Sequence, residues 1–197
     1  MPPRAKFSRD EIVETALAIV RKDGIQALTA RALGEKLGSS ARPVFTVFQN
    51  MEEVQDEVLK AARALYKGYI DRGLQETPAF RGVGRQYILF AIEEPKLFQL
   101  LFMAEQERIP ELGEVLMLID ESYERILASV EISYGLTGSD AKRLYQHMWI
   151  YSHGIASLCA SKMCHFSGEE ISGMMAEVIS SLIRKIREGK ESGGKQL

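Results

Sequence analysis

The segment that follows Gly38 combines hydroxyl side chains and one arginine with bulky apolar residues. A short helix over residues 39–48 would turn its apolar side, Val44, Phe45 and Phe48, towards a core and leave its polar side open. Hydroxyl groups can hydrogen-bond base edges, and an arginine can make a bidentate contact with guanine. These residue types predict recognition of a nucleic acid. The polar side is expected to consist of Ser39, Ser40, Arg42 and Thr46.

Two predicted helices precede this segment and would position it. The first opens at Ser8, whose hydroxyl can cap a backbone N–H while Glu11 reaches back to the start of the helix. This helix is expected to end at Gly24, because glycine readily takes the positive φ of a helix end. Thr29 is the expected N-cap of a short second helix, whose N-terminal N–H groups could bind a phosphate.

The turn between the second and third helices completes a recognisable pattern. Gly38 breaks the second helix, and Pro43 is tolerated only in the first turn of the third. The third helix is therefore expected to begin between residues 39 and 41. A buried helix, a glycine-containing turn and a second short helix are the parts of a helix-turn-helix. The same spacing also fits a small helical hairpin without any role at DNA.

The charge of the chain is unevenly distributed. The net charge is −2, yet the first 50 residues hold eight Lys or Arg against five Asp or Glu, and the remainder holds 17 against 22. A basic N-terminal part on an acidic remainder fits a polyanion-binding module attached to a regulatory or oligomerising body. Chance also produces an excess of this modest size.

Helical periodicity continues over the rest of the chain, and no convincing strand pattern is found. We expect Asn50 and Glu53 to cap a long helix that leads towards Ile70. The remaining helices are expected over residues 77–94, 96–106, 110–134, 139–163 and 167–188. The predicted fold is all-α with about nine helices. It comprises a helix-turn-helix domain of residues 1–50, a helical body of residues 51–188 and a polar, disordered tail of residues 189–197.

Residues 8–60 resemble the N-terminal domain of the TetR family of bacterial regulators. The resemblance rests on Ile12 to Leu17, Gly24, Leu28 to Gly38, the aromatics Phe45 and Phe48, and the helix start at Asn50 to Glu53. It implies a homodimer that places two recognition helices in successive major grooves of a near-palindromic operator. The residues expected at the DNA are Thr29, Arg31, Ser39, Ser40, Ala41, Arg42, Pro43, Phe45, Thr46, Gln49 and Asn50.

Two positions depart from the family pattern. A tyrosine that is common at the end of the recognition helix is replaced by Phe45, and a lysine that is common at the next helix start is replaced by Met51. Loss of both phosphate contacts predicts weaker non-specific binding, since each neutralised phosphate adds to the salt-dependent affinity. The pair Arg42-Pro43 is also unusual. Residues that could compensate in part are Arg4, Lys6, Gln49 and Asn50.

The C-terminal part resembles a TetR-like class marked by Trp and then His-Gly. The matching residues are Trp149, His153 and Gly154, and residues 94–102 fit the same class. The resemblance implies that the body is a ligand-binding and dimerisation domain, with dimerisation through the last two helices. Apolar stripes over residues 144–163 and 171–186 agree, since two such helices can form a four-helix interface with a second copy. The alternative is that these stripes close the core of a monomer.

A pocket for an unknown small, apolar ligand is the expected sensor. Aromatic and methionine side chains with a few polar groups suit such a ligand, although the same residues also build ordinary cores. His153 could bind the effector or hydrogen-bond a backbone carbonyl inside the bundle. The expected lining consists of Phe98, Leu101, Phe102, Met117, Tyr123, Tyr145, Met148, Trp149 and His153.

Other classes of protein find less support in the sequence. No glycine-rich phosphate loop, HExxH motif or nucleophile elbow is present, so we expect no enzyme, no catalytic residue and no cofactor. Cys159, Cys164 and His165 lack the paired spacing of a structural zinc site, and no metal is expected, nor is a redox role favoured. Without a signal-peptide pattern or an apolar run long enough for a membrane, a cytoplasmic protein is expected.

The sequence thus predicts a ligand-responsive repressor that binds double-stranded operator DNA as a homodimer. Transcriptional activation is an open alternative. A helical interaction module that has lost DNA binding is a second one, because of Phe45 and Met51.

Overall fold

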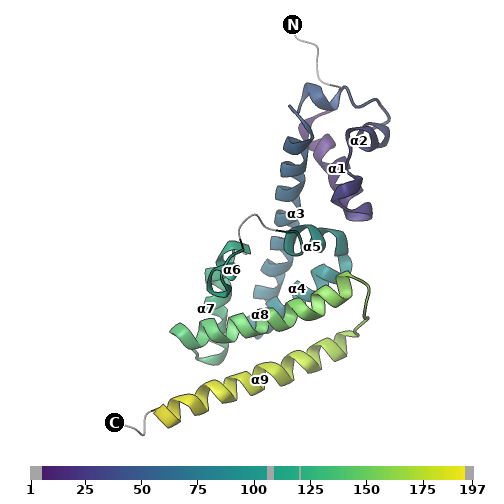
Figure 1. Ribbon diagram of the computed structural model, residues 1–197. Helices are drawn as coiled ribbons and strands as arrows, with labels where there is room; N and C mark the ends of the chain where they lie inside the picture. Colours follow the sequence, from purple (N-terminus) through teal and green to yellow (C-terminus); the bar gives the residue numbers. More distant parts are fainter. Residues whose placement is uncertain (1–5, 106–108, 120, 194–197) are drawn as a thin grey trace. The chain divides into compact units, whose positions relative to one another are not determined.

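The computed structural model describes residues 6–105, 109–119 and 121–193. Within these residues the chain forms nine α-helices, two 3₁₀-helices and no strand (Figure 1), which confirms the predicted all-α fold. In chain order the elements are α1 (Arg9–Asp23), η1 (Ile25–Ala27), α2 (Ala30–Lys36), η2 (Val44–Thr46), α3 (Met51–Leu74), α4 (Ala79–Glu93), α5 (Pro95–Phe102), α6 (Leu112–Ile119), α7 (Tyr123–Tyr134), α8 (Gly138–Ala160) and α9 (Gly168–Gly193). No helix of this described part is both long and apolar enough to cross a membrane.

The described residues divide into two compact units. The N-terminal unit comprises residues 6–66 together with residues 94–105, so α5 belongs to it. The C-terminal unit comprises residues 67–93, 109–119 and 121–193.

Local capping signals define the first helices as the sequence predicts. The Ser8 hydroxyl accepts a hydrogen bond from the Glu11 N–H at 3.1 Å, and Glu11 accepts one from the Ser8 N–H at 2.7 Å, so the capping box is confirmed. Gly24 follows α1 with φ 87°. Thr29 accepts a hydrogen bond from the Ala32 N–H at 3.1 Å and caps α2.

A Schellman motif ends α2. The Ser39 N–H donates to the Gly34 carbonyl at 2.9 Å, and the Gly38 N–H donates to the Glu35 carbonyl at 3.0 Å. Gly38 adopts φ 66°, a left-handed conformation that most other side chains disfavour. A Cβ atom on Gly34 would lie 2.7 Å from the backbone of Ser40 and Ala41. Glycine at position 34 therefore lets the chain fold back closely over α2.

The expected third helix over residues 39–48 is not formed. Only the 3₁₀-helix η2 is present, held by hydrogen bonds such as Val44 N–H to Ala41 carbonyl at 3.0 Å. Pro43 has no N–H to donate and disfavours helical backbone at the residue before it. The Thr46 hydroxyl also donates to the Pro43 carbonyl at 2.7 Å, and short β-branched segments propagate an α-helix poorly. The helix prediction for this segment was wrong.

The core of the N-terminal unit joins α1, α2, η2, α5 and the first part of α3. Burial of each large aliphatic side chain here contributes about 1.5–3 kcal/mol. α5 packs against α1, and Arg21 of α1 makes a bidentate ion pair with the buried Glu94, its Nε lying 2.8 Å from Oε2. The most deeply buried side chains are Ile12, Ala16, Val20, Leu33, Val44, Phe48, Val54, Val58, Ala62, Leu97 and Phe98.

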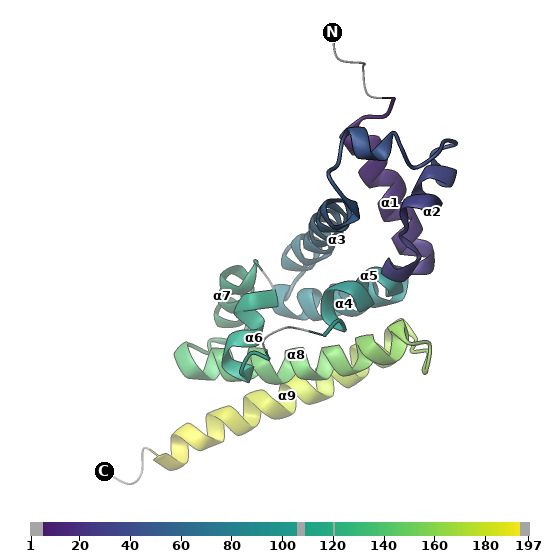
Figure 2. The same ribbon diagram turned by 45° about the horizontal axis from the view of Figure 1, so that its top comes forward.

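The C-terminal unit is built around α4, which packs most extensively against α8 and also contacts α7 and α9. α8 and α9 run side by side in both views of the ribbon (Figure 2). A Cβ atom on Gly82 would lie 2.3 Å from the carbonyl oxygen of Gly73, so α4 and the end of α3 cross in near backbone contact. This closeness requires glycine at the crossing.

Several predicted helix boundaries in this unit were wrong. The helix expected over residues 110–134 is two helices, α6 and α7, and α7 begins just after the buried Ser122. α8 ends at Ala160, before Met163, because the Met163 N–H turns back to the Leu158 carbonyl at 3.0 Å. The capping box at Ser167 and Glu170 is confirmed. Residues 189–193, expected in a disordered tail, continue α9, and residues 194–197 lie outside the described part.

Candidate nucleic-acid interface and effector region

The segment Ala41–Phe48, here called the recognition turn, presents a mixed surface. Val44 and Phe48 are buried as predicted, with Phe48 only 2% exposed. Phe45 is 43% exposed, so its predicted place in the buried face was wrong. With η2 in place of an α-helix, the side chain of Phe45 leaves the face that holds Val44 and Phe48. It stands outward with the polar residues.

The cationic side chains near the recognition turn differ in how they are paired. Arg42 is exposed and has no ion-pair or hydrogen-bond partner among the described residues. Arg31 is exposed too, but its Nε donates to Glu35 at 2.8 Å. Lys6 donates to the Ser39 hydroxyl at 3.1 Å. Arg42 is thus the predicted DNA residue whose guanidinium is most available to a ligand.

Other predicted DNA residues hold the local backbone. The Asn50 side chain accepts a hydrogen bond from the Glu53 N–H at 2.9 Å and caps α3. The Gln49 N–H donates to the Glu53 carboxylate at 2.7 Å, and Gln49 is exposed. The Thr29 hydroxyl accepts a hydrogen bond from the Ala32 N–H of α2, and the Thr46 hydroxyl donates one to the Pro43 carbonyl. Ser40 is exposed, whereas Ala41 and Pro43 are half-buried.

Sequence inspection missed Arg9 as a residue of this region. Its guanidinium lies 4.3 Å from the centre of the Phe48 ring, and its Nη2 lies 2.9 Å from the Glu53 carboxylate and 3.3 Å from that of Glu57. These partners are 39 or more positions away along the chain, so no local pattern indicates them.

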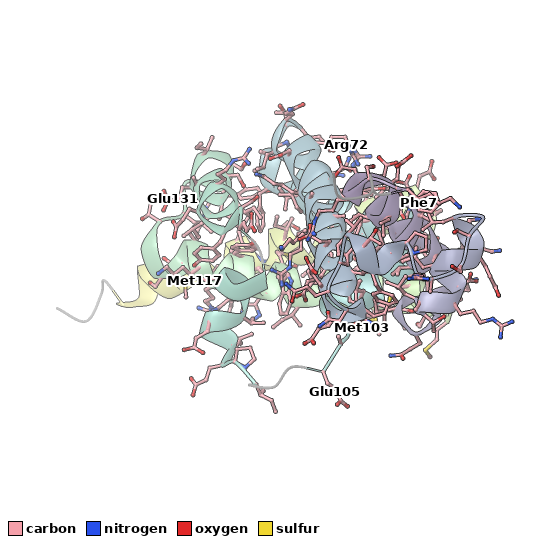
Figure 3. The ribbon with its side chains drawn as sticks, turned by 90° about the horizontal axis from the view of Figure 1, so that it is seen from above. Phe7, Arg72, Met103, Glu105, Met117 and Glu131 are labelled. Atoms are coloured by element: carbon pink, nitrogen blue, oxygen red, sulfur yellow. The ribbon has the colours of Figure 1, made fainter. Side chains whose placement is uncertain are left out.

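The predicted effector residues divide between the two units. Phe98, Leu101 and Phe102 lie on α5 in the N-terminal unit, where Phe102 packs edge-on against Tyr66 with 5.0 Å between ring centres. The other six lie in the C-terminal unit. Met117, labelled in Figure 3, is 55% exposed on α6 and contributes little to a buried lining.

His153, Tyr87 and Trp149 form a polar cluster on α8 and α4. The Tyr87 hydroxyl lies 2.8 Å from His153 Nδ1, and the Trp149 ring stacks on His153 at 5.3 Å. The partner at Nδ1 is thus a tyrosine hydroxyl of α4, which sequence reasoning did not name. The buried Trp149 Nε1 has no hydrogen-bond partner among the described residues. Burial lowers the pKa of His153, so its neutral form is favoured near pH 7.

A second aromatic cluster joins α4, α7 and α8. Tyr123 stacks on Tyr145 at 5.7 Å, and Phe80 packs edge-on against Tyr145 at 5.8 Å. Tyr145 and Met148 are nearly inaccessible, as core residues are. Sequence reasoning named Tyr145, Met148 and Tyr123 but missed Tyr87 and Phe80. Their positions on the buried side of α4 could have indicated them.

The outer face of α8 carries apolar side chains at helical spacing. Ile150 is 47% exposed and Leu158 is 37% exposed, with the exposed Gly154 between them. On α9 an open hollow of about 400 Å³ is lined by Glu177, Val178, Ser181 and Leu182. Ile150, Leu158 and the residues that line this hollow are thus only partly covered by the described residues of the same chain.

Cys159 and Cys164 are free cysteines, the first half-buried and the second exposed. Burial, with a smaller contribution from Cys164, raises the pKa of Cys159 and disfavours its thiolate. The described residues contain no group of three His, Cys, Asp or Glu side chains that could hold a metal ion.

Comparison with known proteins places the chain in a family. Residues 80–182, just over half of the chain, match the family described as "Tetracyclin repressor-like, C-terminal domain". No curated protein matches. The fold is similar to that of a solved structure from Rhodococcus sp. RHA1, a protein with unknown function. The TM-score is 0.65 at 17% identity, and the match covers 94% of this chain and 98% of the other. On the family match, the protein belongs to the TetR family of regulators.

Proposed function

We propose that this protein is a ligand-responsive transcriptional repressor that binds a near-palindromic DNA operator as a homodimer. The observation that carries the proposal is the recognition turn. It exposes Arg42 and Phe45, with the exposed Ser40 just before it, while Val44 and Phe48 anchor it in the core. An unpaired guanidinium beside hydroxyl groups suits a guanine edge, and an aromatic ring suits a thymine methyl group. Action on chromosomal DNA would take place in the cytoplasm.

Dimerisation is proposed through α8 and α9. The exposed Ile150 and Leu158 lie on one face of α8, and exposed apolar faces of this kind mark interaction sites. The hollow on α9 offers space for side chains of a second copy. Two-fold pairing of these helices would give a four-helix interface between two chains. Each chain would then place one recognition turn at one half-site of the operator.

The effector is proposed to bind in the C-terminal unit near Trp149 and His153. The buried Trp149 Nε1–H without a partner and the half-buried His153 supply polar groups among aromatic rings. Binding would favour one conformation of the dimer over another and thereby change its DNA affinity. Because Trp149 is the sole tryptophan, its fluorescence would report occupation of this region directly.

The test is a selection of bound sequences from fragmented genomic DNA, followed by anisotropy titrations of the enriched site. We expect two chains per site and tight binding that falls with salt. Arg42→Ala should lose about 10- to 100-fold in affinity and relax the sequence preference at one position of each half-site, as for a lost bidentate contact. Lys142→Ala, which removes one exposed charge from the C-terminal unit, is the matched control and should bind as wild type.

A second candidate function is a helical interaction module without DNA binding. It is favoured by the missing α-helix over residues 39–48, since the 3₁₀ turn presents fewer side chains than a recognition helix. In this case the selection would enrich no sequence, and Arg42→Ala would not alter the weak binding to random DNA.

A further inference from the structure

We infer that Arg9 and Glu53 are positioning residues that hold the recognition turn in its DNA-binding geometry. Neither is proposed to touch the DNA. The inference rests on the proposed function, because it assigns a role in the same DNA contact. It differs in naming residues outside the recognition turn, one at the start of α1 and one in the first turn of α3.

Arg9 acts on the end of the recognition turn. Its guanidinium lies over the face of Phe48 at 4.3 Å from the ring centre, a cation–π geometry. Phe48 is 2% exposed, and its N–H donates to the Val44 carbonyl at 3.0 Å, which closes the turn. A shift of Arg9 would therefore move the ring that anchors this end of the segment.

Glu53 fixes the two residues that follow. Its carboxylate accepts the Gln49 N–H at 2.7 Å and the Arg9 guanidinium at 2.9 Å, and its own N–H donates to the Asn50 side chain at 2.9 Å. The hydrogen bond from Gln49, and next that from Arg9, hold the pKa of Glu53 below its ordinary value, so it is ionised at neutral pH. One carboxylate thus ties α1 to the backbone that leaves the recognition turn.

The charge of Arg9 is already paired with carboxylates of the same chain. Glu53 at 2.9 Å and Glu57 at 3.3 Å both lie on α3, one helical turn apart. A guanidinium that already neutralises two carboxylates gains less from a phosphate than the unpaired Arg42 does. This pairing separates the role of Arg9 from that of a phosphate-contacting arginine.

The two roles make opposite predictions for removal of the carboxylate charge. If Glu53 affects DNA binding only through its charge, Glu53→Gln makes the N-terminal unit more positive and binding to the polyanion tightens. If Glu53 positions the recognition turn, the same change frees Arg9 and weakens specific binding. Glu52→Gln is a matched control, because Glu52 is an exposed neighbour in the same turn of α3.

The experiment measures anisotropy of the selected operator and of a random duplex with the full-length protein at several salt concentrations. We expect Glu53→Gln to lose about fivefold in operator affinity, the size of a lost exposed ion pair. The affinity of Glu53→Gln for the random duplex should stay the same or rise. The affinities of Glu52→Gln for the operator and for the random duplex should also stay the same or rise. Arg9→Ala should lose a similar factor, Arg9→Lys should recover part of it, and the double variant Arg9→Ala with Glu53→Gln should lose no more than either single one.

Several outcomes would overturn the inference. Tighter operator binding by Glu53→Gln, equal to that of Glu52→Gln, would leave only the charge effect. A salt slope reduced by about one for each chain bound, or about two for the dimer, in Arg9→Ala would make Arg9 a phosphate contact. Additive losses in the double variant would show two independent residues. If wild type selects no DNA sequence, the proposed function fails and this inference with it. If wild type binds its operator but the Arg9 and Glu53 variants do not lose operator affinity as expected, only this inference fails and the proposed function stands.

Discussion

Each of the two units is stabilised internally by a different kind of contact. In the N-terminal unit, short helices are fixed at their ends by polar groups, as in the Schellman motif of α2 and the ion pair of Arg21 with Glu94. In the C-terminal unit, long helices cross closely, with Gly82 against Gly73 and aromatic rings between α4 and α8. A seven-residue helix such as α2 buries too little apolar surface to be stable alone, so side-chain caps contribute more there.

This difference indicates where each unit tolerates change. An exposed polar contact of the N-terminal unit contributes about 1 kcal/mol or less, so loss of one such contact should cost little. Close helix crossings in the C-terminal unit allow almost no added volume, because a packed interior does not yield. Substitutions that add or remove a few atoms should therefore act differently in the two units.

The largest effect is expected from Gly82→Ala. The new Cβ would lie 2.3 Å from the Gly73 carbonyl oxygen, and backbone atoms cannot move aside cheaply. We expect a loss of about 3 kcal/mol in unfolding free energy, at the upper end for an overpacked core, measured by urea denaturation. Gly84→Ala is the control, because its Cβ would meet the flexible end of Met175. Equal losses in both variants would contradict a rigid crossing at Gly82.

Gly34→Ala tests the same kind of close approach in the N-terminal unit. Its Cβ would lie 2.7 Å from the backbone of Ser40 and Ala41, which lie in irregular backbone between α2 and η2. We expect a smaller loss, about 2 kcal/mol, in urea denaturation. We also expect operator affinity to fall by more than the unfolded fraction explains, because the recognition turn moves. Unchanged operator binding by the folded protein would contradict this link.

The features that the sequence predicts correctly are those set by neighbouring residues. Ser8 with Glu11, Thr29, and Ser167 with Glu170 cap helices within three positions, so their spacing is sufficient to predict them. The missing third helix had a local sign as well, namely Pro43. Pro43 is compatible with the first turn of an α-helix, but the residues after it form only the 3₁₀-helix η2.

Features that depend on distant partners could not be predicted in the same way. The place of α5 in the N-terminal unit follows from its packing on α1. Arg21 and Glu94, which pair at this contact, are 73 positions apart in the sequence. The hydrogen bond of His153 with Tyr87 and the contacts of Arg9 with Phe48 likewise join separate helices. A periodicity argument gives the buried side of each helix but not which helix covers it.

A smaller effect is expected from two matched cap variants, Ser8→Ala and Ser167→Ala. Both serines belong to capping boxes with nearly equal distances, so each change should cost about 1 kcal/mol at neutral pH in urea denaturation. Only Ser8→Ala should weaken operator binding, because Arg9 begins the helix that Ser8 caps. Equal effects of both variants on DNA would contradict the separation of the two units' roles.

The same boxes should respond to acid in a defined direction. Hydrogen bonds from Ser8 lower the pKa of Glu11 from its ordinary 4.5, and those from Ser167 do the same for Glu170. Each carboxylate therefore stabilises the fold above pH 4.5, and this contribution is lost as the pH falls through the lower folded value. The difference between each serine variant and wild type should shrink over that range.

The smallest effect concerns the titration of His153. Burial lowers its pKa from the ordinary 6.5, so the unfolded chain takes up the proton first as the pH falls. The contribution of neutral His153 to stability is complete above pH 6.5 and decreases as the pH falls through the folded value. Because Trp149 stacks on this ring, its fluorescence should change with a midpoint below 6.5. His147→Asn, an exposed histidine of the same helix, should leave the transition intact, whereas His153→Asn should abolish it. A midpoint at or above 6.5 would mean that the cluster is open to water, and the C-terminal unit would then lack the buried polar site that its aromatic packing indicates.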